Sequence, residues 1–142
     1  MDRDERRQAF RLIQLTWMAL LGGVVVFGAV AWALAAGVLG GGGWSPALDP
    51  SLARPLLLVP VALLGIGVVL RRSSVRLPDG TDPMEVYRLQ TLLVSALQEG
   101  GGLLGIALCL AAGLTNWIPV FAGLSVFAMV LSRPRATDLD DV

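Results

Sequence analysis

The residues most able to do chemistry lie in one short stretch, SALQEGGG, at positions 95 to 102. Glu99 is an acid inside a long apolar segment, Ser95 precedes it by one helical turn, and Gln98 is its polar neighbour. A carboxylate in this setting can exchange a proton or a cation, or anchor a cofactor or a lipid headgroup. It can equally be a neutral acid that is hydrogen-bonded to Ser95, to a backbone carbonyl or to a partner chain. The residue types leave both interpretations open.

Other reactive side chains are few. Cys109 is the single cysteine and lies deep in the same apolar segment, so it is interpreted as a small packing residue. The chain has no histidine, which removes the commonest metal and haem ligand and the usual general base. No phosphate-binding loop and no nucleophile with a base is present. We therefore expect no enzyme activity and no metal site, and the sequence assigns no cofactor.

The glycines beside the acid have a packing interpretation. Gly101 and Gly105 form a GxxxG pair, which lets a neighbouring helix approach closely. At 100° per residue they point about 200° to 240° away from Glu99. Gly23 and Gly28 are expected to serve the same purpose in the first apolar segment. We therefore expect the acid and the glycine pair to face different neighbours.

The elements that must position these residues are apolar helices. The chain has 142 residues, of which 55% are hydrophobic and 15% charged, with a formal net charge of zero. Its apolar residues come in runs long enough to cross a bilayer, for which about 20 residues are needed. The sequence predicts an all-α polytopic membrane protein with four spans in two hairpins, a single membrane domain over residues 1–142. The spans are expected at about 12–36, 53–70, 90–113 and 117–131.

Local signals refine two of these spans. Pro60 lies inside the second and should bend it, because proline removes one backbone hydrogen bond and crowds the preceding turn. The third is expected to begin before the membrane, with Asp82 as N-cap and Pro83 at the first helical position. It should enter the membrane near Gln90. Glu99 then lies roughly 13 Å inside, where a charged acid costs on the order of 3 kcal/mol or more.

Arginine distribution predicts the orientation. Arginines cluster at the N-terminus, in the loop between the second and third spans, and at the start of the tail, whereas the other two loops hold only Arg54. The positive-inside rule then makes both termini and the middle loop cytoplasmic. Trp44 and Trp117 are expected as anchors at the outer interface and Tyr87 near the inner one. Because all eleven basic residues are arginine, the composition suggests a high-GC bacterial genome and an inner-membrane location.

A weak internal repeat appears when the chain is shifted by 77 residues. The shift pairs Arg11 with Arg88, Gly23 with Gly100 and Gly28 with Gly105. It suggests two parallel copies of a helical hairpin, related by an axis along the membrane normal. Glu99 then corresponds to Gly22, so the acid belongs to the second half only.

The stretch ALQEGGGLLGIALCL resembles the carboxylate-bearing helix of rotary ATPase proteolipid subunits, in which a glutamate among small residues carries the proton. The resemblance covers about fifteen residues. In that family the acid lies on the second helix of a hairpin, and the polar loop signature of the family is missing here. Small multidrug resistance transporters share four spans and one membrane glutamate, but theirs is on the first helix. As a whole the chain looks most like small four-span bacterial inner-membrane proteins, a group that implies no activity.

Two functions are therefore weighed. The first is a non-enzymatic integral-membrane subunit or scaffold of a larger inner-membrane assembly, held to partner subunits or to further copies of itself, without nucleic acid. The alternative is a small oligomeric transporter or channel, coupled to protons or ions through Glu99. A lipid- or pigment-binding module is a weaker third class. The first two differ in whether Glu99 faces a solvated cavity or a packed helix.

Overall fold

The computed structural model describes residues 3–38, 45–73 and 83–134. These residues form the helices α1 (Arg3–Ala35), α2 (Pro50–Leu56), α3 (Leu58–Arg72), α4 (Pro83–Ala111) and α5 (Ile118–Leu131), with a 3-10 turn η1 (Thr115–Trp117) before α5. No strand occurs among them, so the all-α prediction is confirmed for this part of the chain. The stretches Arg7–Ala35, Pro50–Arg72 and Met84–Ala111 are apolar and long enough to cross a membrane, and Thr115–Leu131 is a shorter apolar helix.

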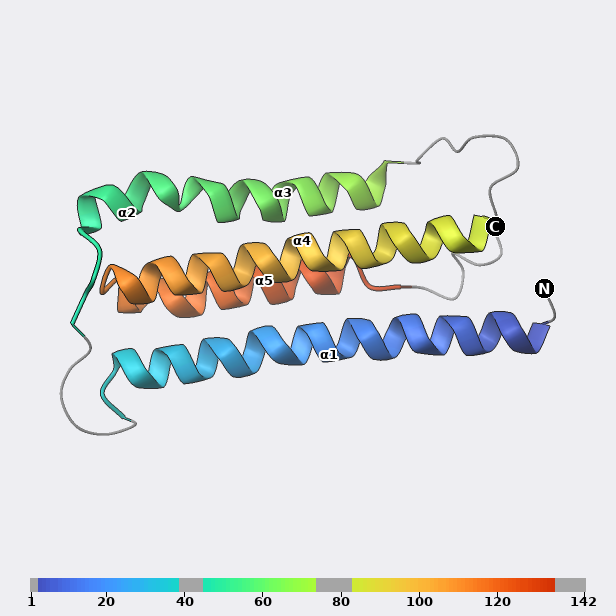
Figure 1. Cartoon of the computed structure of the whole chain (residues 1–142), viewed down its shortest axis with the longest axis horizontal. Helices are drawn as coiled ribbons and strands as arrows, with labels where there is room; N and C mark the ends of the chain where they lie inside the picture. Colours follow the sequence, from blue (N-terminus) through green and yellow to red (C-terminus); the bar gives the residue numbers. More distant parts are fainter. Residues whose placement is uncertain (1–2, 39–44, 74–82, 135–142) are drawn as a thin grey trace.

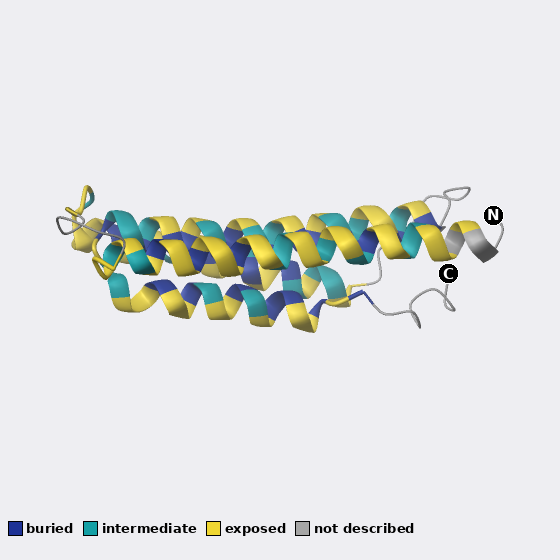
Figure 2. Ribbon diagram, turned by 90° about the horizontal axis from the view of Figure 1, so that it is seen from below, coloured by how far each residue is buried: buried dark blue, intermediate teal, exposed yellow. Residues whose placement is uncertain are grey.

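The helices pack as a bundle with α4 at its centre. Figure 1 shows α1, α4 and α3 side by side, with α5 behind α4. Helices α1 and α4 run in the same direction, and α3 and α5 run in the opposite one. Figure 2 shows the burial that results: buried residues line the faces between helices, and exposed residues cover the outside. The outer surface is rich in large apolar side chains, among them Leu15, Val26, Val69 and Phe127.

The second apolar segment is irregular at Leu57, although Leu57 keeps a helical φ of −64° and ψ of −14°. It divides at Leu57 into α2 and α3, one turn before Pro60. Pro60 has no N–H to bond the carbonyl of Leu56, and the next bond, from Val61 N to Leu57 O, is stretched to 3.5 Å. Pro60 therefore weakens the helical hydrogen bonds locally, where α2 ends and α3 begins.

Local signals also fix helix ends. Asp49 precedes α2, and its Oδ1 accepts a hydrogen bond of 2.8 Å from the Ser51 N–H. α4 begins at Pro83, the position expected for the first turn, while the proposed cap Asp82 lies outside the described residues. At its other end Gly113 has a φ of 68°, and Leu114 N bonds Cys109 O at 2.8 Å, which closes α4 with a Schellman motif.

The hydrophobic core lies where α1, α4 and α5 meet. Its fully or nearly buried members are Ala31, Ile106, Cys109, Ile118 and Phe121. Cys109 is therefore a packing residue between helices, as its apolar surroundings suggested. A second small cluster, made of Ile13, Met84 and Tyr87, joins the other ends of α1 and α4.

Candidate functional site

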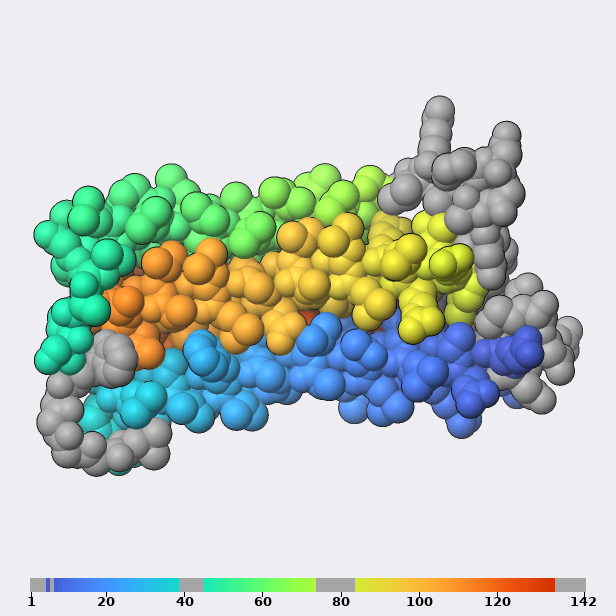
Figure 3. Space-filling model, in the orientation of Figure 1, coloured from blue at the N-terminus to red at the C-terminus, as the bar shows by residue number. Residues whose placement is uncertain are grey.

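Glu99 lies near the middle of α4, at the seam between α4 and α1. A Cβ atom placed on Gly23 of α1 would be 3.5 Å from Glu99 Oε1, so the carboxyl rests against the α1 backbone where that helix has no side chain. The side chain is partly exposed. Figure 3 shows the face on which α4 lies between α1 and α3 and packs directly against both. Glu99 is thus wedged beside a neighbouring helix and still opens to the outside of the bundle.

The carboxyl of Glu99 has no partner in the described part of the chain, either as a hydrogen bond or as an ion pair. Ser95, one turn earlier, is 4% exposed and does not bond it. Neither of the two surface hollows described below is lined by Glu99. The three residues predicted as one polar site therefore do not converge on a single point.

Gln98 occupies a separate, fully buried position between three helices. Its side-chain Nε2 donates a hydrogen bond of 2.7 Å to Ser132 Oγ, just after α5. The Ser125 hydroxyl donates to the backbone carbonyl of Gln98 at 2.8 Å. On the α3 side, Gly67 makes room: a Cβ there would lie 2.9 Å from Gln98 Cγ. Gln98 therefore joins α3, α4 and α5, while its Oε1 is buried without a hydrogen-bond partner.

The packing glycines of α4 face two different helices. Gly101 lies against α3, where a Cβ would be 3.0 Å from the Pro60 carbonyl oxygen. Gly105 lies against the ring of Phe121 on α5, and a Cβ would be 2.6 Å from its Cγ. Gly102, between them, lies against Ser125 of α5. At Gly102 and Gly105 the backbone approaches its neighbour more closely than a Cβ would allow, and at Gly101 a Cβ would require the neighbour to shift.

On α1, the two predicted packing glycines differ in their surroundings. Gly28 is buried, and a Cβ there would be 2.9 Å from Ala122 Cβ on α5. Gly23 meets only the Glu99 carboxyl and is otherwise exposed. Its neighbour Gly22 has nothing within 4 Å of a Cβ, and the same holds for Gly100 beside Glu99. Gly22 and Gly100 therefore leave exposed backbone next to Glu99 on the outer face.

The α3–α4 interface is polar where α3 ends and α4 begins, which the sequence did not reveal. The guanidinium of Arg71 lies 5.4 Å from the centre of the Tyr87 ring and 3.5 Å from Thr91 Oγ1. Gln90 Nε2 donates to Leu70 O at 2.8 Å, which satisfies a carbonyl in the last turn of α3. Tyr87, predicted as an interface anchor, is 8% exposed and packs inside this cluster.

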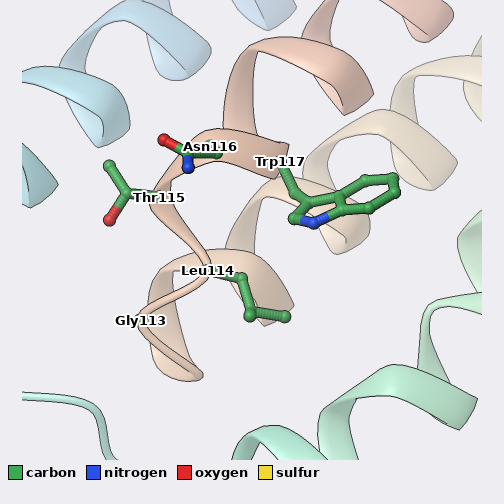
Figure 4. Close-up of a pocket in the computed structure, with 5 residues that line it drawn as sticks. All are labelled: Gly113, Leu114, Thr115, Asn116 and Trp117. Carbon is green, nitrogen blue, oxygen red and sulfur yellow. The ribbon is translucent and has the colours of Figure 1, made fainter.

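One of the two predicted outer anchors, Trp117, lies at the turn between α4 and α5. Trp117 is 52% exposed there, and Trp44 lies outside the described residues. Residues 113 to 117 surround a shallow hollow of about 330 Å³. Thr115 and Trp117 extend to opposite sides of this turn (Figure 4). No charged or catalytic side chain lines the hollow.

A second hollow of about 270 Å³ lies between α3 and α5 and is apolar. It is lined by Val61, Leu64, Gly65, Val68, Leu124, Phe127, Ala128 and Leu131. Within residues 3–38, 45–73 and 83–134, no three histidine, cysteine or acidic side chains come together as a metal site would require.

Sequence reasoning missed the buried serines on which Gln98 depends. Ser125 and Ser132 are seven residues apart, which places both on one face of a helix. That spacing was the available signal that both serines share one buried face. Trp17 was missed as well: its indole Nε1 donates to the Met129 carbonyl at 3.2 Å and ties α1 to α5.

No protein-family model matches the chain, and no curated protein or solved structure is significantly similar to it.

Proposed function

We propose that this chain is a non-enzymatic integral-membrane subunit or scaffold of a larger assembly in a bacterial inner membrane. Three apolar helices of sufficient length and a shorter fourth support four membrane crossings. The arginine distribution favours cytoplasmic termini and a cytoplasmic middle loop. With this orientation the Gly113 turn faces outward, and the ends of α4 and α3 that carry Tyr87 and Arg71 face the cytoplasm.

One observation carries the proposal: Glu99 lies near the middle of α4, a helix long enough to cross a membrane, opens to the outer face and has no side-chain partner among the described residues. An unpaired acid at that depth is costly, so a membrane protein satisfies it with a partner or keeps it neutral. The adjoining backbone at Gly22 and Gly100 is open and permits another helix to approach closely. A docking face for another transmembrane element supplies a partner for the acid and makes use of the open backbone.

The experiment is purification of the tagged full-length chain from its native membrane after brief chemical crosslinking, with extraction into lipid nanodiscs. Proteins that accompany the chain are quantified against an unrelated four-span protein expressed at the same level. The proposal expects at least one distinct membrane protein at a fixed ratio to the chain. Recovery of the chain with no protein enriched over the control would reject the subunit role.

Because an unpaired carboxyl at mid-span is also what proton coupling requires, one alternative keeps support: an oligomeric proton- or ion-coupled transporter or channel that uses Glu99. It predicts proton flux into vesicles that contain the purified chain, and loss of this flux in Glu99→Gln. A scaffold predicts no flux for either protein. Flux that is equal in both proteins would remove Glu99 from the transport mechanism.

A further inference from the structure

We infer that Glu99 is the docking point for a second copy of this chain, whose Arg133 forms an ion pair with it. The inference deepens the proposed function by naming one partner. It rests on the membrane crossing of that proposal and does not require a distinct partner protein.

Glu99 and Arg133 lie at the same level of the bundle. Gln98 Nε2 and Ser132 Oγ are joined by a hydrogen bond of 2.7 Å, and each charged residue directly follows one member of this pair in the chain. Helix length gives the same result. Measured from the Gly113 turn, Glu99 is about 18 Å down α4 and the end of α5 is about 20 Å down. A copy inserted in the same orientation therefore presents Arg133 at the depth of Glu99.

The two charges lie on different elements and remain unpaired. Glu99 rests against Gly23 at the seam of α4 and α1, whereas Arg133 follows α5, which packs behind α4 (Figure 1). Arg133 is exposed, and in the described part of the chain neither side chain forms a hydrogen bond or an ion pair. Each copy thus offers one unpaired acid and one unpaired base at one depth, from two separate elements.

A second copy offers a basic residue that fits this face. No arginine occurs in residues 12–53, 55–70 or 89–132, so the other arginines within the described helices lie toward the helix ends. Arg88, on α4 itself, is about 16 Å along the axis from Glu99. Among the arginines that the structure describes, Arg133 alone matches Glu99 in both charge and depth. The open backbone at Gly22 and Gly100 allows the neighbouring copy to come close enough for contact.

The contact uses two different surfaces, so it is head-to-tail. Each copy uses Glu99 toward one neighbour and Arg133 toward the other, and such a contact generates a closed ring when the rotation closes. This geometry makes a specific prediction for mixtures of variants. A copy with Glu99→Gln retains Arg133, and a copy with Arg133→Gln retains Glu99, so one variant can complement the other through one interface only.

The test measures the native mass of the full chain in lipid nanodiscs. Wild-type chains should form particles of more than two copies. Glu99→Gln and Arg133→Gln should each weaken self-association at least about 30-fold and appear as single chains, because removal of one member leaves a buried charge unpaired. An equal mixture of the two should form pairs and nothing larger. Glu85→Gln and Arg72→Gln, which change exposed charges near the helix ends, should assemble as the wild type does.

A second measurement is independent of the charge change. In a Cys109→Ser background, Gly100→Cys and Val130→Cys each place one thiol on an exposed position next to one of the two surfaces. Oxidation should crosslink a mixture of the two variants but neither variant alone. Single chains in the wild type, wild-type mass in either charge variant, or crosslinking of one cysteine variant with itself would overturn the inference. Co-purification of a distinct protein would remain unaffected by that failure, so the two proposals are separable.

Discussion

Replacing Gly105 with alanine should destabilise the bundle, whereas the same change at Gly123 should stabilise it. A Cβ at Gly105 would lie 2.6 Å from Phe121 Cγ, closer than any relaxed contact. Phe121 is 3% exposed and is held in the core by Ile106, Cys109 and Ile118, so its ring cannot move aside. Gly123 lies on α5 and has nothing within 4 Å of an added Cβ.

The magnitude follows from a comparison of the two variants. Each replacement gains up to about 1 kcal/mol of helix propensity, because glycine is poorer than alanine in a helix. Only Gly105→Ala also forces α4 and α5 apart, and overpacking of a tight interface costs about 1–3 kcal/mol. The propensity gain cancels in the comparison. Gly105→Ala should therefore be about 1–3 kcal/mol less stable than Gly123→Ala.

The assay is reversible unfolding in mixed micelles with increasing SDS, followed by tryptophan fluorescence, for wild type and both variants. Because Gly105 and Gly123 lie in the same helix pair, detergent effects on the unfolded state are matched. A Gly105→Ala protein as stable as Gly123→Ala, or more stable, would refute the close packing of α4 against α5.

Two other pairs of residues and one proline give further predictions. Ser132→Ala should cost about 1–2 kcal/mol in the same assay, because Gln98 would lose the acceptor of its Nε2 while Oε1 is already unpaired; Gln98→Met should cost less, since it removes both buried groups. The Ser51 backbone N–H, and then its side chain, lower the pKa of Asp49 below the usual range. The ionised Asp49 carboxylate therefore stabilises the start of α2 fully above the ordinary aspartate pKa, and this stabilisation is lost as pH falls through the lowered pKa. Amide hydrogen exchange at Ser51 would detect the loss. Asp49→Asn would abolish this pH dependence. Pro60→Ala should restore the missing backbone bond, and NMR secondary shifts should then show one continuous helix from residues 50 to 72.

The helices were predictable because each consists of an apolar run bounded by local signals. The runs near residues 12–36 and 90–113 predict α1 and α4, and Pro83 marks where α4 begins. The position of Pro60 also indicated where the second segment would lose its regular bonding. The sequence did not indicate that the irregularity would fall at Leu57, where α2 ends and α3 begins.

The surroundings of the candidate site were only partly predictable. Helical angles correctly give the directions of Glu99, Gly101 and Gly105 relative to one another, since these depend on α4 alone. They do not say which helix lies in each direction, and Gly101 proves to face α3 while Gly105 faces α5. For the same reason Gln98 was grouped with Glu99, although tertiary packing buries it between Gly67 and Ser132.

The central claim is that this chain works as part of a membrane assembly with Glu99 at a contact between chains. The most direct test is the native mass of the particle released in lipid nanodiscs from native membranes, for wild type and Glu99→Gln. We expect a wild-type particle with several copies of the chain and a distinct protein at fixed ratio, and loss of the multiple copies in Glu99→Gln. A wild-type particle that contains one chain and no other protein would contradict it.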